Sequence, residues 1–268
     1  MLSPSTRLGV LGWPVAHSRS PAIHNAALRE VGLSGWRYQL LPVPAGLLSE
    51  TVLALPAAGF RGVNVTIPHK QAALALAEQA TVRARAIGAA NTLIFDDDGT
   101  IQAENTDAPA LIDALPSAIA GATALVLGAG GSARAVIWAL RDAGAREVRV
   151  WNRTPERARR LAEELGATAV EHAAPADLLV NCTSVGLDGS TATFEQLPVC
   201  TEALSDYGCV VDLVYSDRGT ELVRAAQARG VPVVNGLQLL VGQGALSFEL
   251  FTGRPAPVAQ MRAAAAVR

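Results

Sequence analysis

The sequence predicts an α/β protein built from two successive sheets. From Arg7 onward, short apolar and β-branched runs alternate with helical stretches, which is the order of a mainly parallel sheet. The same order restarts at Thr123, where a glycine-rich turn directly follows the first strand of the second half. The 268 residues are enough for two ordinary domains. We therefore expect an α/β domain followed by a second, doubly wound one.

In the first half, turn-forming residues mark where each expected element ends. Ser20 is expected to cap the first helix with Pro21 at its first position, and Gly32 is expected to end it. An Asp-Gly pair at Asp98-Gly99 predicts a hairpin between two strands. The expected strands are 7–11, 37–41, 62–67, one opening at 88–92 and one at 100–104, and the expected helices are 21–31, 45–58 and an alanine-rich one from 69.

In the second half, strands and helices follow one another again, and no low-complexity linker or sequence repeat interrupts them. A helix with Pro109 in its first turn leads into it. Expected strands are 123–127, 147–151, 178–181, 209–214 and 231–234, and expected helices are 132–143, 154–165 and 219–229. A mostly apolar helix, 237–251, and a last alanine-rich helix then close the chain.

Composition excludes several functional classes. Acidic residues (24) and basic residues (22) nearly cancel, so the chain has no basic surface for nucleic acid and no polybasic membrane patch. Cys182, Cys200 and Cys209 lack metal-site spacing, and we expect reduced thiols and no metal. The balanced charges favour a small neutral or anionic ligand. No signal peptide or membrane-spanning run is visible, which predicts a soluble, cytoplasmic protein.

Lys70 is the only lysine, although Lys and Arg together number 22. Arginine stays protonated in proteins, whereas a lysine amine can lose its proton, so a proton-transfer role would explain why arginine does not replace it. A chance surface lysine is the alternative. Lys70 follows the strand-like run ending at Ile67-Pro68, at the carboxyl end of a strand, where open α/β sheets bind ligands.

The glycine-rich turn of the second half predicts a dinucleotide site. Between a strand and a helix lie Gly128, Ala129, Gly130, Gly131 and Ser132. Glycines in this position allow the backbone to approach a pyrophosphate, whose charge then meets the helix N-terminus. A purely structural turn is the alternative. The context of two strands and a helix favours a Rossmann-like dinucleotide-binding domain.

The end of the second strand of this domain predicts which dinucleotide binds. Rossmann-like domains that bind NAD have an acidic residue at this strand end. Here the strand ends in Asn152, Arg153 and Thr154, and Arg157 follows one helical turn later. Arginine binds a 2′-phosphate that an acid would repel, so we expect NADP. The alternative is that both arginines are solvated helix-start residues, as we expect for Arg159 and Arg160.

Three further positions are expected to border the cofactor. Thr183 and Leu213 follow two other strands of the second sheet at their carboxyl ends. Gly236 directly precedes the apolar helix near the end of the chain.

Six separated stretches together resemble one family. They are 12–25 (Gly-x-Pro-x-x-His-Ser-x-Ser-Pro-x-x-His-Asn), 64–70 (Asn-Val-Thr-x-Pro-x-Lys), 89–92 (Ala-x-Asn-Thr), 105–107 (Asn-Thr-Asp), 128–131 (Gly-Ala-Gly-Gly) and 152–154 (Asn-Arg-Thr). In this order and over nearly the whole chain, they resemble the shikimate dehydrogenase family.

The resemblance implies roles for individual residues. Ser18 and Ser20 would hold a substrate carboxylate, and Lys70 and Asp107 would be the catalytic pair. Hydrogen bonds to the body and ring hydroxyls of the substrate would come from Thr66, Asn91, Tyr215 and Gln243. From the residues alone, Ser20 could be only a helix cap, Asn91 a turn residue and Gln243 a polar residue on an exposed helix face.

The resemblance also implies an activity and a domain layout. The activity would be the reversible, NADPH-dependent reduction of 3-dehydroshikimate to shikimate, in the pathway to chorismate and the aromatic amino acids. A substrate domain, 1–107, completed by 237–268 packing back on it, would flank an NADP domain, 108–236, in a monomer or homodimer. An NAD-dependent quinate/shikimate dehydrogenase and a catalytically silent dinucleotide- or metabolite-sensing protein on the same fold are the alternatives.

Four residues depart from the family pattern. Asp217 stands where proline is usual, and Cys182 stands where alanine is usual. Ala110 stands where glycine often follows the Asn-Thr-Asp motif, and Leu239 stands where a methionine commonly lies against the nicotinamide. None of these is a polar group assigned to the chemistry. They are expected to affect affinity more than reaction type.

Overall fold

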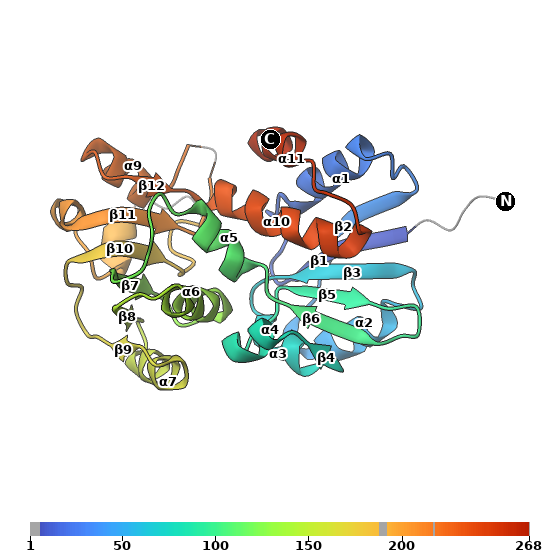
Figure 1. The fold of residues 1–268 in the computed structure, drawn as a ribbon, viewed down its shortest axis with the longest axis horizontal. Coiled ribbons are helices and arrows are strands. Elements are labelled where there is room, and N and C mark those ends of the chain that lie inside the picture. Colours follow the sequence, from blue (N-terminus) through green and yellow to red (C-terminus); the bar gives the residue numbers. More distant parts are fainter. Residues whose placement is uncertain (1–5, 188–191, 217, 268) are drawn as a thin grey trace. The chain divides into compact units, whose positions relative to one another are not determined.

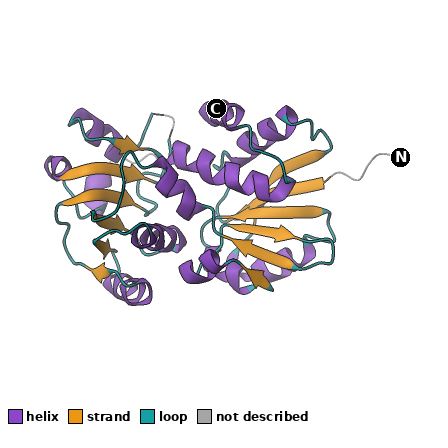
Figure 2. Ribbon diagram, viewed as in Figure 1, coloured by secondary structure: helices purple, strands orange, loops and turns teal. Residues whose placement is uncertain are grey.

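The computed structural model describes residues 6–187, 192–216 and 218–267 (Figure 1). It divides into two compact units. Unit 1 holds the chain up to Thr106 together with the residues from Leu240 onward, and unit 2 holds Asp107–Leu239. Figure 2 shows helices and strands in both units, so the predicted α/β class is confirmed.

Unit 1 contains a six-stranded mixed sheet of order β2-β1-β3-β5-β6-β4. The neighbours of β1 are parallel to it, whereas β5 runs antiparallel to both β3 and β6, and β4 is parallel to β6. The strands are β1 (Thr6–Gly12), β2 (Trp36–Pro42), β3 (Phe60–Val65), β4 (Gln79–Ala80), β5 (Thr92–Phe95) and β6 (Ile101–Glu104). The sheet is mainly parallel, and β5 and β6 form the hairpin that the Asp-Gly pair predicts.

Among the residues that the structure describes, six α-helices belong wholly or partly to unit 1: α1 (Ser20–Glu30), α2 (Leu48–Ala54), α3 (Lys70–Ala75), α4 (Val82–Ile87), α10 (Gly236–Thr252) and α11 (Val258–Ala266). α11 packs against α1, so the end of the chain returns to the first unit as predicted. A Cβ on Gly62 would lie 2.5 Å from the Phe251 ring, which shows how closely α10 packs on β3. Packing therefore explains the glycine at position 62 inside β3.

Unit 2 contains a six-stranded, wholly parallel sheet of order β12-β11-β10-β7-β8-β9. The chain adds strands on one side of β7 and then on the other, so the strand order reverses beside β7. Such a switch point opens a crevice at the carboxyl ends of the strands. The strands are β7 (Thr123–Leu127), β8 (Glu147–Trp151), β9 (Thr168–Ala169), β10 (Ala176–Asn181), β11 (Tyr207–Asp212) and β12 (Val233–Val234).

The helices of unit 2 join these strands, and most of them match the predicted stretches to within a few residues. They are α5 (Asp107–Ala114), α6 (Gly131–Asp142), α7 (Pro155–Leu165), α8 (Thr193–Gln196) and α9 (Glu221–Ala228). Leu125 and Leu179, at the centre of the sheet, are completely buried. Strands apolar on both faces are what a parallel sheet covered by helices requires.

Several boundaries differ from the sequence-based prediction. The helix expected over 45–58 is a short 3₁₀ turn (Ala45–Leu47) followed by α2, and β4, β9, α8 and a 3₁₀ turn at Glu202–Asp206 were not anticipated. α1 begins at Ser20 with Arg19 at the N-cap and no side-chain cap, so the prediction of Ser20 as N-cap was wrong. The strand expected to reach Val214 ends at Asp212, whose carboxylate accepts the Val214 N–H.

Candidate functional site

The carboxyl ends of β1 and β3 are joined by backbone hydrogen bonds. Thr66 donates its N–H to the Leu11 carbonyl (2.8 Å), and Trp13 donates to the Ile67 carbonyl (2.9 Å). The loops that leave these two strands each contain a cis prolyl bond, at Pro14 and Pro68. The loop carrying the two serines and the loop carrying Thr66 and Lys70 therefore leave the sheet side by side.

The two serines predicted to bind a carboxylate contact each other. The Ser18 hydroxyl donates to the Ser20 oxygen (3.2 Å), and the Ser20 N–H donates back to the Ser18 oxygen (3.3 Å). Ser20 is buried and Ser18 is half-buried. No side-chain hydrogen bond caps α1, which begins at Ser20. The pair presents two hydroxyl groups at one point.

Lys70 is the first residue of α3, and Thr66 lies in the loop before it. The Lys70 carbonyl accepts the Ala90 N–H (2.8 Å), and the Asn91 carbonyl accepts the Val65 N–H (2.8 Å). Both Lys70 and Thr66 are half-buried. The loop that carries Lys70 is thereby held against the loop that carries Asn91.

Asn91 is a buried amide, only 2% exposed, and its side chain organises its surroundings. It donates to the Thr106 hydroxyl (2.9 Å) and to Gln243 Oε1 (3.3 Å), and its Oδ1 accepts the Thr106 N–H (2.8 Å). Gln243, half-buried on α10, is therefore brought to Asn91 from 152 residues away. Two residues predicted to bind substrate meet here, and Gln243 does not lie on an exposed helix face.

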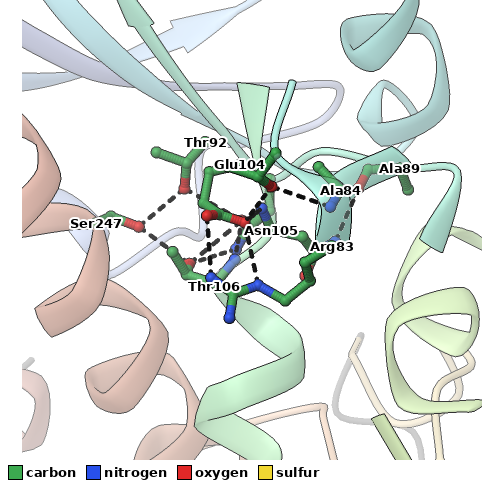
Figure 3. A network of polar contacts seen from close by, with 10 residues as sticks. Arg83, Ala84, Ala89, Thr92, Glu104, Asn105, Thr106 and Ser247 are labelled. Atoms are coloured by element: carbon green, nitrogen blue, oxygen red, sulfur yellow. Dashed lines mark hydrogen bonds and ion pairs between the residues drawn. The ribbon is translucent and has the colours of Figure 1, made fainter. Parts of the chain in front are cut away.

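Asp107 follows Thr106 directly and is the first residue of α5, where an acid is favoured by the helix dipole. It is half-buried. The segment before it is fixed by Glu104, which pairs with Arg83 (3.0 Å) and accepts the Asn105 N–H (2.6 Å). Figure 3 shows Arg83, Glu104, Asn105 and Thr106 in one connected network. The chain therefore reaches Asp107 from a rigid strand end.

Sequence reasoning assigned no role to Asn64, Ser247, Tyr38 and Glu104, which support this site. Asn64 donates from Nδ2 to the Ser247 oxygen (2.8 Å) and accepts the Tyr38 hydroxyl proton (2.8 Å). Two signals could have been used. Asn64 is a polar residue between two valines of β3, and Ser247 lies four residues after Gln243, on the same helix face.

In unit 2, the turn after β7 has the geometry of a phosphate-binding loop. Gly128 has φ of +109°, and a Cβ there would lie 3.1 Å from the Cys182 backbone. A Cβ on Gly130 would meet no protein atom within 4 Å, so the loop has open space where α6 begins at Gly131. The half-buried Ala129 and Ser132 flank these glycines. The residues present fit a pyrophosphate against the N-terminus of α6.

The end of β8 carries exposed arginines. Arg153 and Arg157 are exposed, and among the residues that the structure describes neither pairs with a carboxylate. Arg159, by contrast, pairs with Glu156 and Glu171. Asn152 donates to the Thr154 carbonyl (2.9 Å) and shapes the turn. The guanidinium groups before and after this turn are therefore available to an anion.

Asp212 was not predicted as a site residue, although it joins the loops after β10 and β11. Its carboxylate accepts from Asn181 (2.9 Å), from the Val214 N–H (3.0 Å) and from the Thr220 hydroxyl (2.5 Å). Asn181 in turn accepts the Thr183 hydroxyl proton (2.7 Å). Burial raises the pKa of Asp212 from its ordinary 3.8 to about 6, against the lowering effect of these hydrogen bonds.

The same loops enclose Gly236 and carry Leu213 and Tyr215. A Cβ on Gly236 would lie 2.6 Å from the Val214 carbonyl oxygen and 2.7 Å from that of Leu213. Packing alone therefore requires glycine at 236. The Leu213 N–H donates to the Asn181 carbonyl (3.0 Å), and Tyr215 is half-buried in the segment after β11.

Three family models match successive parts of the chain. The shikimate dehydrogenase substrate-binding domain matches residues 10–93, shikimate / quinate 5-dehydrogenase matches 110–185, and the shikimate 5'-dehydrogenase C-terminal domain matches 236–266. The shikimate dehydrogenase (NADP(+)) of one strain of Thermus thermophilus is 49% identical over 256 residues, 92% of each chain. The chain belongs to the shikimate dehydrogenase family.

Solved structures of shikimate dehydrogenases share this fold. The enzyme of another Thermus thermophilus strain, in complex with NADP(H) and shikimate, is 44% identical with a TM-score of 0.84, covering 97% of this chain and 98% of that one. The enzyme of Aquifex aeolicus is 31% identical with a TM-score of 0.89, covering 98% of both. The Rossmann-like fold of unit 2 and the dehydrogenase family are therefore confirmed.

Within residues 6–187, 192–216 and 218–267, no cluster of three or more His, Cys, Asp or Glu could hold an ion. The buried His69 ring hydrogen-bonds to the Val43 carbonyl (2.6 Å), and His24 is fully buried, whereas His17 and His172 are exposed. In the same described ranges, no helix is long and apolar enough to cross a membrane.

The described residues that depart from the family pattern are buried or half-buried. Cys182 is half-buried, and its backbone packs on Gly128. Ala110 is buried inside α5, and Leu239 is half-buried on α10. Asp217 lies outside the described residues. Cys182, Cys200 and Cys209 are free thiols.

Proposed function

We propose that this chain reduces 3-dehydroshikimate to shikimate with NADPH, and that Lys70 and Asp107 carry the proton chemistry. The observation that carries the proposal is the meeting of Asn91, Thr106 and Gln243 next to the loop of Lys70. These neutral amide and hydroxyl groups suit a polyhydroxylated ring. Membership in a family of NADP-dependent shikimate dehydrogenases supports the same substrate.

In the proposed substrate site, each polar group has a distinct task. The Ser18 and Ser20 hydroxyls bind the carboxylate: the Ser20 hydroxyl donates to it, and the Ser18 hydroxyl, which donates to Ser20 in this structure, rotates to donate to the substrate instead. Thr66, Asn91, Tyr215 and Gln243 bind the body and hydroxyls of the ring. These groups orient the substrate ketone toward Lys70.

The proposed proton transfer uses the single lysine. The Lys70 ammonium donates a hydrogen bond to the ketone oxygen and gives up its proton as an alkoxide develops there. In the oxidation direction, the neutral amine accepts that proton. Asp107 binds the same hydroxyl group or Lys70 itself and fixes its position. NADPH, when bound, supplies the hydride.

In the proposed cofactor site, residues of unit 2 bind separate parts of the dinucleotide. The pyrophosphate lies on the turn formed by Gly128, Ala129, Gly130, Gly131 and Ser132. The 2′-phosphate is bound by Arg153 and Arg157, beside Asn152 and Thr154, where an NAD-selective site would have an acid. Thr183, Leu213 and Gly236 border the nicotinamide half. We place the NADP domain at 108–236 and the substrate domain at 1–107 with 237–268.

An activity assay tests the proposal. Oxidation of NADPH in the presence of 3-dehydroshikimate, followed by absorbance, is expected for the wild type, and quinate with NAD is expected to react far more slowly. Preferred turnover of quinate with NAD would establish the quinate/shikimate alternative. No turnover of either pair would leave the silent sensing protein as the function. Cytoplasmic location and a monomeric or homodimeric state are also proposed, and sedimentation measures the latter.

A further inference from the structure

Two polar residues end neighbouring strands of unit 2. β10 and β11 lie side by side (Figure 1), and their last residues, Asn181 and Asp212, are paired in register. Both residues are completely buried. The amide, the backbone N–H and the hydroxyl that donate to the Asp212 carboxylate are all uncharged. Burying a carboxylate costs free energy that a neutral side chain would not, so stability alone does not explain Asp212.

The two oxygens of Asp212 connect different parts of the chain. Oδ1 accepts from the Asn181 amide (2.9 Å) and from the Val214 N–H (3.0 Å). Oδ2 accepts from the hydroxyl of Thr220 (2.5 Å), eight residues further on. The Thr220 oxygen in turn accepts the Val223 N–H (3.2 Å) and caps α9. The start of the segment that leaves β11 and the start of the helix that follows it are therefore tied to one carboxylate.

Asn181 extends the same network to the loop after β10. Its Oδ1 accepts both the N–H (3.1 Å) and the hydroxyl (2.7 Å) of Thr183, and its carbonyl accepts the Leu213 N–H (3.0 Å). The Cys182 N–H donates to the Leu127 carbonyl (2.8 Å), which places this loop beside the glycine turn that follows β7. Thr183 and Leu213 are thereby held at the edge of the sheet where the pyrophosphate is proposed to lie.

We infer that Asp212 is a positioning residue for the cofactor, which holds Thr183 and Leu213 where they meet NADP. The inference rests on the proposed cofactor site, since both residues are assigned there. Without the carboxylate, the Asn181 amide and the Thr220 hydroxyl lose their acceptor and turn to other partners. The loops after β10 and β11 are then no longer preorganised, and NADP must order them as it binds.

The main test is Asp212→Ala in the full chain, with NADPH binding measured by titration calorimetry. We expect the Kd for NADPH to rise about tenfold, because part of the binding free energy then orders the two loops. Asp212→Asn keeps hydrogen-bonding groups in the same place and is expected to bring the Kd to within about twofold of the wild type. Binding is measured without turnover, so the result does not depend on the assigned catalytic residues.

A pair of threonine variants gives a milder test with a matched control. Thr220→Val removes the hydroxyl that donates to Asp212 and is expected to raise the Kd about threefold, as the loss of one hydrogen bond does. Thr123, the first residue of β7, contacts Asp177 in a similar way, because its hydroxyl donates to the carboxylate (2.8 Å) and accepts a backbone N–H (3.1 Å). The glycine turn follows the other end of β7, so Thr123→Val should lower stability without changing the Kd.

The outcomes separate this inference from the proposed function. Wild-type Kd values in Asp212→Ala and Thr220→Val overturn the inference and leave the proposed cofactor site standing. A wild-type protein that does not bind NADPH overturns both. If Asp212→Ala does not fold, the two threonine variants decide. A Kd raised by Thr220→Val alone supports the inference, whereas an equal rise in both variants overturns it, because lost stability would then account for the weaker binding.

Discussion

The two units position their functional groups in opposite ways. In unit 1, side chains such as Asn64, Asn91 and Ser247 hydrogen-bond to one another inside the protein. In unit 2, the glycine turn acts through its backbone, and one buried carboxylate, Asp212, holds the neighbouring loops. In the proposed function, substrate recognition therefore depends on side-chain identity, whereas binding of the pyrophosphate depends on the absence of side chains in the glycine turn.

The largest effect is expected from replacing Lys70, whose charge stands among neutral amide and hydroxyl side chains in the proposed substrate site of unit 1. Lys70→Ala is expected to lower kcat by about 10³-fold, within the range for losing a general acid. Lys70→Arg keeps the charge but cannot give up a proton, so it should fall nearly as far. Stopped-flow single-turnover kinetics measure the effect. An arginine variant with near-wild-type kcat would show that only the charge matters.

The carboxylate of unit 2 should make stability depend on pH. Asp212 has a pKa raised from its ordinary 3.8 to about 6, so the folded state binds more protons than the unfolded state in that interval. The contribution of Asp212 is therefore greatest near pH 4 and is lost as pH rises through 6, by about 3 kcal/mol. Urea unfolding of the wild type and of Asp212→Asn between pH 4 and 7 measures it.

The Asp212→Asn variant removes the titrating group and keeps the hydrogen bonds that hold the loops. Its amide oxygen can still accept from Asn181 and Val214, and its amide nitrogen can donate to the Thr220 hydroxyl. The difference in unfolding free energy between the two proteins should slope with pH below 6 and be flat above it. A difference that stays constant from pH 4 to 7 would mean that Asp212 keeps an ordinary pKa.

Two glycines of the turn in unit 2 should respond differently to the same methyl group. Gly128→Ala is expected to destabilise the fold by about 1–3 kcal/mol, because its φ is +109° and the Cβ meets the Cys182 backbone. Gly130→Ala meets no protein atom, so stability should hold while the KM for NADP rises. Thermal unfolding and kinetics on both variants check this. Unchanged NADP binding in Gly130→Ala would place the pyrophosphate elsewhere.

The smallest expected effect concerns cofactor choice. Arg153→Ala should reduce the preference for NADP over NAD about tenfold, the worth of one charge-assisted contact to phosphate. Arg159→Ala is the matched control, because that guanidinium pairs with Glu156 and Glu171. The ratio of kcat/KM for the two cofactors is the measurement. An equal effect of both substitutions would point to general charge and not to a specific contact.

Much of the layout could be predicted from local patterns. β7 and β8 lie at the predicted residues, because apolar runs bounded by glycines and charged residues mark a buried parallel strand in any sequence. Short elements such as β4 and β9 were not predicted, since two-residue strands exist only through their neighbours. The capping of α1 was predicted wrongly, because the helix begins one residue earlier than expected, at Ser20 itself, and the Ser20 hydroxyl contacts Ser18.

The sequence by itself determined the α/β class, the family and the residue types at the proposed site. A lone lysine after a strand and a glycine turn between strand and helix are local, and their chemistry can be read without coordinates. Only the tertiary structure decided that Gln243 meets Asn91, that Tyr38 donates to Asn64, and that Asp212 is buried. These contacts join residues far apart in the chain, and they form because packing the elements removes water and leaves each buried polar group needing a partner.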